Sequence, residues 1–236
     1  MFTLDQVVPW GRSYDEYRRM FALTEQDLGR SILGCGDGPA SFNAEATRLK
    51  SRVVSCDPLY RFDTAQIRQR IAATYDEVIE QTRRNSGEFV WESGIETVEE
   101  LGRVRMAAMQ MFLDDYDLSK ASGRYVDGEL PALPFADGAF DLALCSHFLF
   151  LYSPQLGEAF HHAAALELCR VAAEIRIFPL LALGGEPSPF VDGCVRRLTE
   201  MGYDAAIETV AYEFQRGGNQ MLRVRRRGSR PAKRPD

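Results

Sequence analysis

The feature that most constrains this chain of 236 residues is a glycine-rich turn at residues 31–42, with the sequence SILGCGDGPASF. It places Gly34, Gly36 and Gly38 at alternate positions, directly after an apolar run and directly before a segment of helical character. Glycine adopts positive φ angles freely and has no Cβ to hold a ligand away from the backbone. The N-terminus of the following helix also offers N–H groups to a ligand. The sequence therefore predicts a strand, a ligand-binding turn and a helix in that order.

The rest of the chain continues this alternation of strands and helices. Apolar runs predict buried strands at residues 30–34, 51–57, 123–128, 138–146 and 173–178. Helices are expected at residues 39–49, from Ser153-Pro154 to about Val171, and from Ser188-Pro189 to Met201. Residues 205–214 and 219–226 predict a hairpin that turns at 216–218. We therefore expect a doubly wound α/β domain on a mostly parallel seven-stranded sheet, with helices on both faces and an antiparallel C-terminal hairpin.

One connection is far too long for a simple turn. Residues 58–123 separate the second and third strands and contain two segments of helical periodicity, the second beginning with the capping-box pair Thr97 and Glu100. Residues 1–29 form a further helical segment, with a capping box at Ser13 and Glu16. We expect residues 1–222 to form a single domain that carries 58–123 as a helical insertion. Two roles stay open for the insertion, which either packs on the sheet edge alone or caps a bound substrate.

Composition narrows the class of protein. Hydrophobic residues make up 45% and charged residues 26%, no apolar run reaches membrane-spanning length, and the N-terminus lacks a signal-peptide pattern. These features favour a cytoplasmic globular protein without a membrane span. The five cysteines are scattered, with no C-x-x-C pair, so we expect small buried side chains rather than a disulfide framework or a zinc site. No metal is expected.

Charge is distributed unevenly along the chain. Residues 223–236 carry seven Lys or Arg and one acid, so that the net charge of −6 divides into about +6 there and −12 elsewhere. A basic tail can bind nucleic acid or an anionic membrane, but it can equally be a solvated terminus. We expect a flexible basic tail at 223–236.

An acid further along the chain points to the kind of ligand. Asp57 follows Gly38 by 19 residues and stands at the end of the second predicted strand, where an acid hydrogen-bonds ribose hydroxyls. The glycine spacing differs from the G-x-G-x-x-G of nicotinamide-binding proteins, and Asp37 is unfavourable beside a diphosphate. No P-loop lysine follows the turn. The residues thus favour a nucleoside-containing cofactor that carries no phosphate.

Taken together, these motifs resemble those of class I S-adenosylmethionine-dependent methyltransferases. ILGCGDG resembles the first motif of that family, VVSCDP its ribose-binding acid, and YVDGELPALPFADGAFDLALCSHFLFLY its third and fourth motifs. The resemblance spans residues 30–152, with a loose continuation to 178. It implies S-adenosylmethionine as the cofactor and does not specify the methyl acceptor.

The resemblance assigns cofactor contacts to four groups of residues. The turn would lie along the methionine and ribose, Asp57 would bind the ribose, and Pro58, Glu129 and Leu130 would contact the adenine. The strand end Cys145, Ser146 and His147 would line the methionine portion. The residues of the turn are Gly34, Cys35, Gly36, Asp37 and Gly38. One departure concerns the family's usual acid two positions before the first glycine, which is Ile32 here, so Asp5, Asp37 or another N-terminal residue would have to bind the methionine amino group.

Candidate catalytic and substrate residues are fewer. Methyl transfer is an in-line displacement that depends on alignment and exclusion of water, and a base is needed only where the acceptor loses a proton. His147 is the best-placed base, although a packing role is the alternative. Candidates for the substrate site or its lid are Trp10, Arg12, Tyr14, Tyr17, Tyr60 and Arg176. Core packing for the aromatic residues and an ion pair for Arg176 are the alternatives.

These observations predict methyl transfer from S-adenosylmethionine to a small-molecule acceptor. A nucleic-acid methyltransferase is the nearest alternative, and it rests on the basic tail alone, because CSHF is not the Asn- or Asp-Pro-Pro-Tyr motif of enzymes that methylate a flipped base. Nucleic acid is therefore not the expected partner. A non-catalytic S-adenosylmethionine-binding module is the third alternative.

Overall fold

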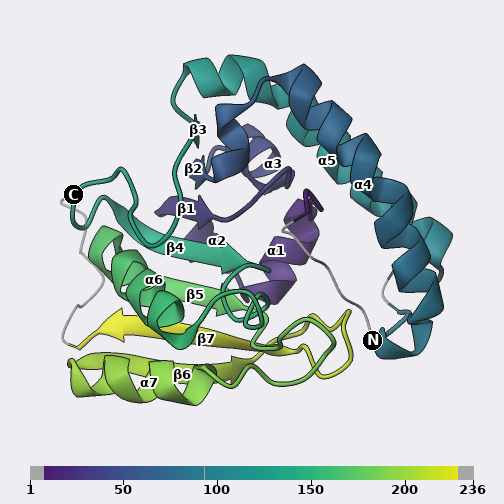
Figure 1. Cartoon of the computed structure of the whole chain (residues 1–236). Coiled ribbons are helices and arrows are strands. Elements are labelled where there is room, and N and C mark those ends of the chain that lie inside the picture. The colour runs from purple at the N-terminus through teal and green to yellow at the C-terminus, as the bar shows by residue number, and fades with distance from the viewer. Residues whose placement is uncertain (1–7, 93, 228–236) are drawn as a thin grey trace.

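The computed structural model describes residues 8–92 and 94–227 and contains a seven-stranded sheet with the order β3-β2-β1-β4-β5-β7-β6 (Figure 1). The first five strands are parallel, and β7 runs antiparallel to both of its neighbours. The strands are β1 Ser31–Cys35, β2 Arg52–Cys56, β3 Tyr125–Val126, β4 Phe140–Ser146, β5 Ala172–Phe178, β6 Tyr203–Thr209 and β7 Gln220–Arg226. The predicted fold class is confirmed.

Helices cover both faces of the sheet, because the central strands carry apolar side chains on both faces. Ile32 and Leu142 pack against α1 and α3, while Leu33 and Ala143 pack against α6 and α7. The helices are α1 Tyr14–Met20, α2 Glu25–Leu28, α3 Phe42–Arg48, α4 Thr64–Arg84, α5 Val98–Ala121, α6 Glu158–Val171 and α7 Val191–Glu200, with 3₁₀ turns η1 Pro58–Arg61 and η2 Ser86–Glu88. All five cysteines are buried in the layer beneath α6 and α7.

The insertion is a helical hairpin of α4 and α5 that starts beside β3 and runs along the molecule (Figure 1). Its far end meets the β6–β7 loop, where the Val90 N–H donates to the Phe214 carbonyl at 2.7 Å. The Arg216 N–H donates in return to the Glu88 carbonyl at 2.9 Å, and the rings of Phe89 and Phe214 stack at 5.0 Å. The insertion therefore connects two distant parts of the sheet in addition to packing at its edge.

Two helix starts differ from the prediction. α6 begins at Glu158 rather than at Ser153, since the Ser153 hydroxyl donates to the Phe150 carbonyl and bonds the Ser188 hydroxyl at 2.7 Å. α7 begins at Val191 after a turn at Pro189. In both cases the serine side chain is engaged in joining two loops, and a Ser-Pro pair does not reveal this.

The C-terminal hairpin also differs in detail. β6 ends at Thr209, so residues 210–219 form a loop rather than a tight turn, and β7 continues to Arg226. Arg223 lies within β7 and pairs with Glu174 and Glu208. The basic tail predicted to begin at 223 therefore begins after the strand, and its residues 228–236 lie outside the described part of the chain.

None of the helices in the described ranges has the length and apolar character needed to cross a bilayer.

Candidate functional site

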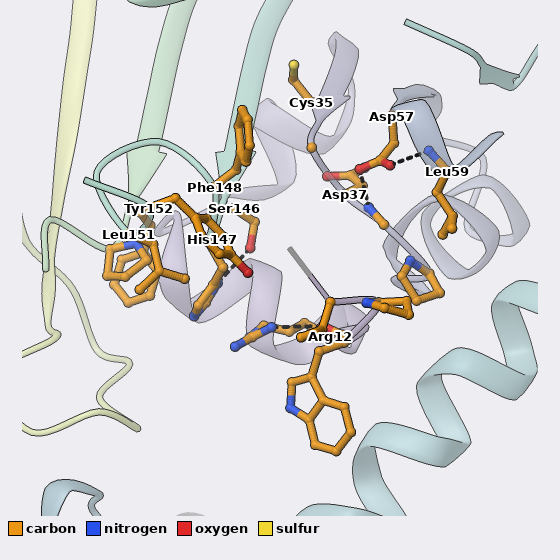
Figure 2. A pocket seen from close by; sticks show the side chains of 18 of the residues that line it. Arg12, Cys35, Asp37, Asp57, Leu59, Ser146, His147, Phe148, Leu151 and Tyr152 are labelled. Carbon is orange, nitrogen blue, oxygen red and sulfur yellow. Dashed lines mark hydrogen bonds between the residues drawn. The ribbon is translucent and has the colours of Figure 1, made fainter. Parts of the chain in front are cut away.

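A cavity of about 520 Å³ lies at the carboxyl ends of β1, β2 and β4 (Figure 2). Because β1 is flanked by β2 on one side and β4 on the other, this is the place where the strand order reverses, which is the usual ligand site of open α/β sheets. The glycine turn, the start of η1 and the segment after β4 form its inner wall. The N-terminal segment, the insertion and the β6–β7 loop form the remaining walls.

The glycine turn approaches the cavity as the sequence predicted. Gly36 and Gly38 have φ angles of 69° and 53°, in the left-handed region that favours glycine. A Cβ on Gly38 would meet no protein atom within 4 Å, so Gly38 opens onto free space. A Cβ on Gly34 would lie only 1.8 Å from the Asp37 carboxylate. Gly34 thus makes room for Asp37, and it does not line the cavity.

Asp37 anchors the turn from inside. Its carboxylate accepts hydrogen bonds from the Tyr17 hydroxyl and the Ser55 hydroxyl, both at 2.7 Å. Burial raises the pKa of Asp37 to about 6. Asp37, which would be unfavourable beside a diphosphate, therefore connects the turn to α1 and β2.

Asp57 fixes the same turn from the second strand. Its carboxylate accepts the Gly38 N–H at 2.9 Å and the Leu59 N–H at 2.7 Å (Figure 2). Burial raises the pKa of this carboxyl group. The Tyr60 hydroxyl donates to the Gly38 carbonyl at 2.8 Å. Gly38 is thus held at both of its backbone polar groups by side chains of the protein.

Most of the predicted cofactor residues come together around this cavity. The residues that line it are Cys35, Gly36, Asp37, Gly38, Asp57, Pro58, Glu129, Leu130, Ser146 and His147. Gly34 and Cys145 do not line it; Cys145 is fully buried in the core.

His147 lies at the end of β4 in a strained backbone conformation, with a φ angle of 52°. Its Nδ1 is 2.9 Å from the Ser146 hydroxyl, and its ring packs edge-on against Phe178 at 5.5 Å. Burial lowers the pKa of His147 well below its ordinary value, and the positive charges of Arg12 and Arg105 lower it further. The imidazole is therefore neutral.

The predicted lid residues divide into two groups. Trp10, Arg12 and Tyr17 line the cavity. Tyr14 stacks on Phe42 at 5.9 Å, and Tyr60 is buried among the aromatic residues between η1 and α5. Neither ring lines the cavity, so both belong to the core, because their helical spacing faces the sheet and not the ligand.

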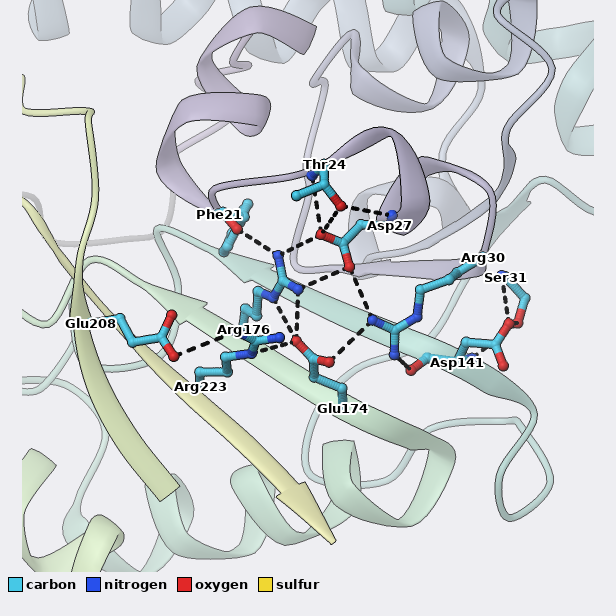
Figure 3. Close-up of polar contacts among 10 residues, drawn as sticks. All are labelled: Phe21, Thr24, Asp27, Arg30, Ser31, Asp141, Glu174, Arg176, Glu208 and Arg223. Atoms are coloured by element: carbon cyan, nitrogen blue, oxygen red, sulfur yellow. Dashed lines mark hydrogen bonds and ion pairs between the residues drawn. The ribbon is translucent and has the colours of Figure 1, made fainter. Parts of the chain in front are cut away.

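Arg176 is also displaced from its predicted place. Its side chain lies away from the cavity, where it bonds Asp27, Glu174 and the Phe21 carbonyl (Figure 3). Residues of β5 alternate between the two faces of the sheet, and Arg176 points toward α1 and α2. Arg176 therefore forms ion pairs, which was the alternative interpretation of this residue, and its assignment as a substrate residue is wrong.

Sequence reasoning missed a charged group behind the cavity. Arg105 on α5 is fully buried and donates to Glu16 at 2.5 Å, and the Tyr212 hydroxyl donates to the other oxygen of Glu16 at 2.8 Å. A signal was present, since Arg105 falls in the buried stripe of α5 between Leu101 and Ala108. A charged residue in an apolar stripe requires a buried partner.

Sequence reasoning also missed several apolar residues that complete the cavity. They come from α4, α5, the segment after β4 and the β6–β7 loop: Val78, Thr82, Leu101, Phe148, Leu151, Tyr152, Tyr212 and Phe214. No group of three or more potential metal ligands occurs in the part of the chain described.

Among solved structures, the chain is similar to magnesium protoporphyrin IX methyltransferase ChlM from Synechocystis PCC 6803, in a structure with bound S-adenosylmethionine. The two are 10% identical with a TM-score of 0.43, over 90% of each chain. It is also similar to a S-adenosylmethionine-dependent methyltransferase from Aquifex aeolicus, at 15% identity and a TM-score of 0.42, over 89% of this chain and 87% of that one.

No family model matches the sequence. One curated protein, the uncharacterized protein MJ0045 of Methanocaldococcus jannaschii, is 35% identical over 224 residues, which cover 94% of this chain and 98% of the relative. Identity at this level over nearly the whole of both sequences shows common descent, and the chain belongs to the same protein family as MJ0045.

Proposed function

We propose that this protein transfers a methyl group from S-adenosylmethionine to a small-molecule acceptor. One observation carries the proposal. A single cavity contains the glycine turn and Asp57 at one end, where the strand order reverses. Its other end is a compartment under the helical insertion that is lined mainly by apolar side chains. A nucleoside cofactor suits the first end, and an organic acceptor suits the second.

The residues present fit the cofactor. Gly38 leaves free space where any other residue would place a Cβ, and Asp57 keeps lone pairs for the ribose hydroxyls besides the two that accept backbone N–H groups. Glu129 and Leu130 would contact the adenine. Because Ile32 is fully buried in the core, the methionine amino group needs another partner, for which Asp37 is a candidate because it lines the cavity; Asp5 lies outside the described residues.

The cofactor supplies an electrophilic methyl group on a sulfonium, so the protein's part is alignment and exclusion of water. The insertion, the β6–β7 loop and the N-terminal segment line the cavity with apolar side chains, among them Leu101, Phe214 and Trp10 respectively. These residues exclude water from the face of the cavity opposite the sheet.

His147 is the proposed base for an acceptor that must lose a proton. Its neutral ring lines the cavity, and in the tautomer whose Nδ1–H donates to the Ser146 hydroxyl, Nε2 is the nitrogen that can take a proton from the acceptor. With an acceptor that must lose a proton, His147→Gln should lower the turnover number about 100-fold or more and change cofactor affinity little.

Calorimetric titration of the purified protein tests the proposal. S-adenosylmethionine and S-adenosylhomocysteine should bind in the micromolar range, and NADH should not bind. Binding of neither compound to folded protein would contradict the proposal. Binding without methylation of any compound in an acceptor screen would favour the non-catalytic module.

A variant tests the ribose assignment. Asp57→Ala should weaken S-adenosylhomocysteine binding by about 1.5–3 kcal/mol, because a charge-assisted pair of hydrogen bonds is lost. Asp76→Ala on the exposed face of α4 is the matched control and should bind as the parent does. Unchanged affinity in a folded Asp57→Ala protein would remove Asp57 from the site.

A further inference from the structure

The compartment under the insertion contains, among the described residues, one cation that is not exposed. The compartment is lined mainly by apolar side chains such as Val78, Leu101 and Phe214, together with the polar Thr82 and Gln215, and Arg12 lines it from the N-terminal segment. Two other arginines line the cavity, Arg61 and Arg70, but both are exposed side chains. Arg12 is half-buried, and its Nε atom is inaccessible to solvent.

Arg12 has few partners for its charge. Its Nη1 donates to the Trp10 carbonyl at 2.9 Å, and its Nε has no hydrogen-bond partner. Within the described residues no carboxylate forms an ion pair with it. A guanidinium stays protonated at physiological pH, so Arg12 carries a positive charge that no carboxylate of the described residues contacts directly.

The nearest buried carboxylate is already used. Glu16 accepts from Arg105, from the Tyr212 hydroxyl and from the Ser13 backbone. Arg105 itself leaves Nε and Nη2 without partners in the described structure. Two guanidinium groups thus share one carboxylate, and the group as a whole is positive.

Neighbouring groups respond to this excess of positive charge. Burial and the charge of Arg105 lower the pKa of Arg12, and both arginines lower the pKa of His147. At the other end of the cavity, the pKa of Asp37 is raised by burial and by the negative charge of Asp57. The cavity therefore has a negative end at the turn and a positive wall at Arg12.

Resting on the proposed function, we propose that the methyl acceptor is an apolar organic anion, whose acid group binds Arg12 while its apolar body fills the compartment under the insertion. An anion in the cavity would supply a counter-charge to the Arg12 guanidinium, and a hydrogen bond to a charged group is strong where water is largely excluded. The apolar walls would hold the body by excluding water.

Two matched probes test the charge requirement. The protein is saturated with S-adenosylhomocysteine and titrated by calorimetry with 2-naphthoate and with 2-naphthylmethanol, which has the same ring and no charge. The parent protein should bind the acid about tenfold or more tightly than the alcohol. Arg12→Gln should lose that preference, Arg12→Lys should keep part of it, and Arg103→Gln, a charge control on the exposed face of α5, should keep all of it.

A second pair of ligands excludes the cofactor as the source of the anion. S-adenosylhomocysteine has a carboxylate and 5′-methylthioadenosine has none. Equal affinities of parent and Arg12→Gln for both compounds would support the acceptor assignment. If Arg12→Gln weakens S-adenosylhomocysteine alone, Arg12 binds the cofactor's carboxylate, and the proposal is overturned. It is also overturned if the parent shows no preference for the acid or if Arg12→Gln retains it.

The proposed function can fail separately. If S-adenosylhomocysteine does not bind the parent protein, the methyltransferase proposal fails, and the naphthyl titration without it still reports whether Arg12 selects anions. Circular dichroism of each variant confirms that it is folded before it is titrated.

Discussion

Two groups of buried charges lie on the same side of the sheet and differ in their balance. Around Arg176, three arginines meet three carboxylates: Arg30, Arg176 and Arg223 bond Asp27, Glu174 and Glu208 (Figure 3). Around Arg12, two arginines share the single carboxylate of Glu16, and three of their nitrogen atoms have no partner in the described residues. The first group is internally neutral, and the second is not.

The difference teaches how to separate structural charges from functional ones. Burying a charge is tolerated when it is paired and hydrogen-bonded, and it is costly otherwise. The neutral group joins α2, β5 and β7 and leaves nothing for a ligand. In the charged group, Arg12 lines the cavity, where an anionic ligand would balance its charge. Four predictions test this contrast, beginning with the largest effect.

Arg176→Leu should lower the free energy of unfolding by about 3–5 kcal/mol, because it leaves Asp27 and Glu174 buried with an incomplete set of cations. Urea denaturation measures the loss. Arg18→Leu, which removes an exposed pair with Glu25, should cost within about 1 kcal/mol. Equal losses for the two variants would show that the buried network does not stabilise the protein.

Glu16 should contribute stability that depends on acidity. Burial opposes its ionisation, but Arg105 outweighs burial and lowers the pKa of Glu16 to about 2 from 4.5. Because the folded pKa is depressed, the contribution of about 3 kcal/mol is complete above pH 4.5 and is lost as pH falls toward 2. The stability difference between the parent and Glu16→Gln should shrink over this window, and a constant difference would argue against the ion pair.

Asp37 should show the opposite dependence. Its pKa is raised to about 6 from 3.8, so its contribution of about 2–3 kcal/mol is complete below pH 3.8 and is lost as pH rises through 6. Relative to Asp37→Asn, the parent protein should therefore lose stability between pH 4 and 6. A gain over that range would place a cation beside Asp37.

Arg12→Gln should change the free energy of unfolding least, by within about 1 kcal/mol, since it removes a charge that has no carboxylate partner among the described residues. Thermal unfolding of ligand-free protein compares it with Arg176→Leu. A loss as large as that of Arg176→Leu would mean that Arg12 is structural, and the distinction between the two groups would fail.

Local sequence patterns predicted the sheet and the glycine turn that lines the cavity. Glycine spacing and the acid at the end of β2 identify the turn, since both depend on residues within a short βαβ unit. The partners of Asp37 could not be predicted in this way, because Tyr17 and Ser55 approach it from two other elements. Arg176 was misplaced for a related reason, as strand position alone does not say which face carries the ligand.

The pairing of Arg105 with Glu16 has a consequence for how this fold can change. Arg105 belongs to the insertion and Glu16 to the N-terminal segment, 89 positions apart, while Phe89 of the insertion stacks on Phe214 of the last loop. Shortening the insertion would leave an acid buried without its cation and an aromatic ring without its cover. The three segments therefore form one interdependent unit, and a change in the length of one should require matching changes in the other two.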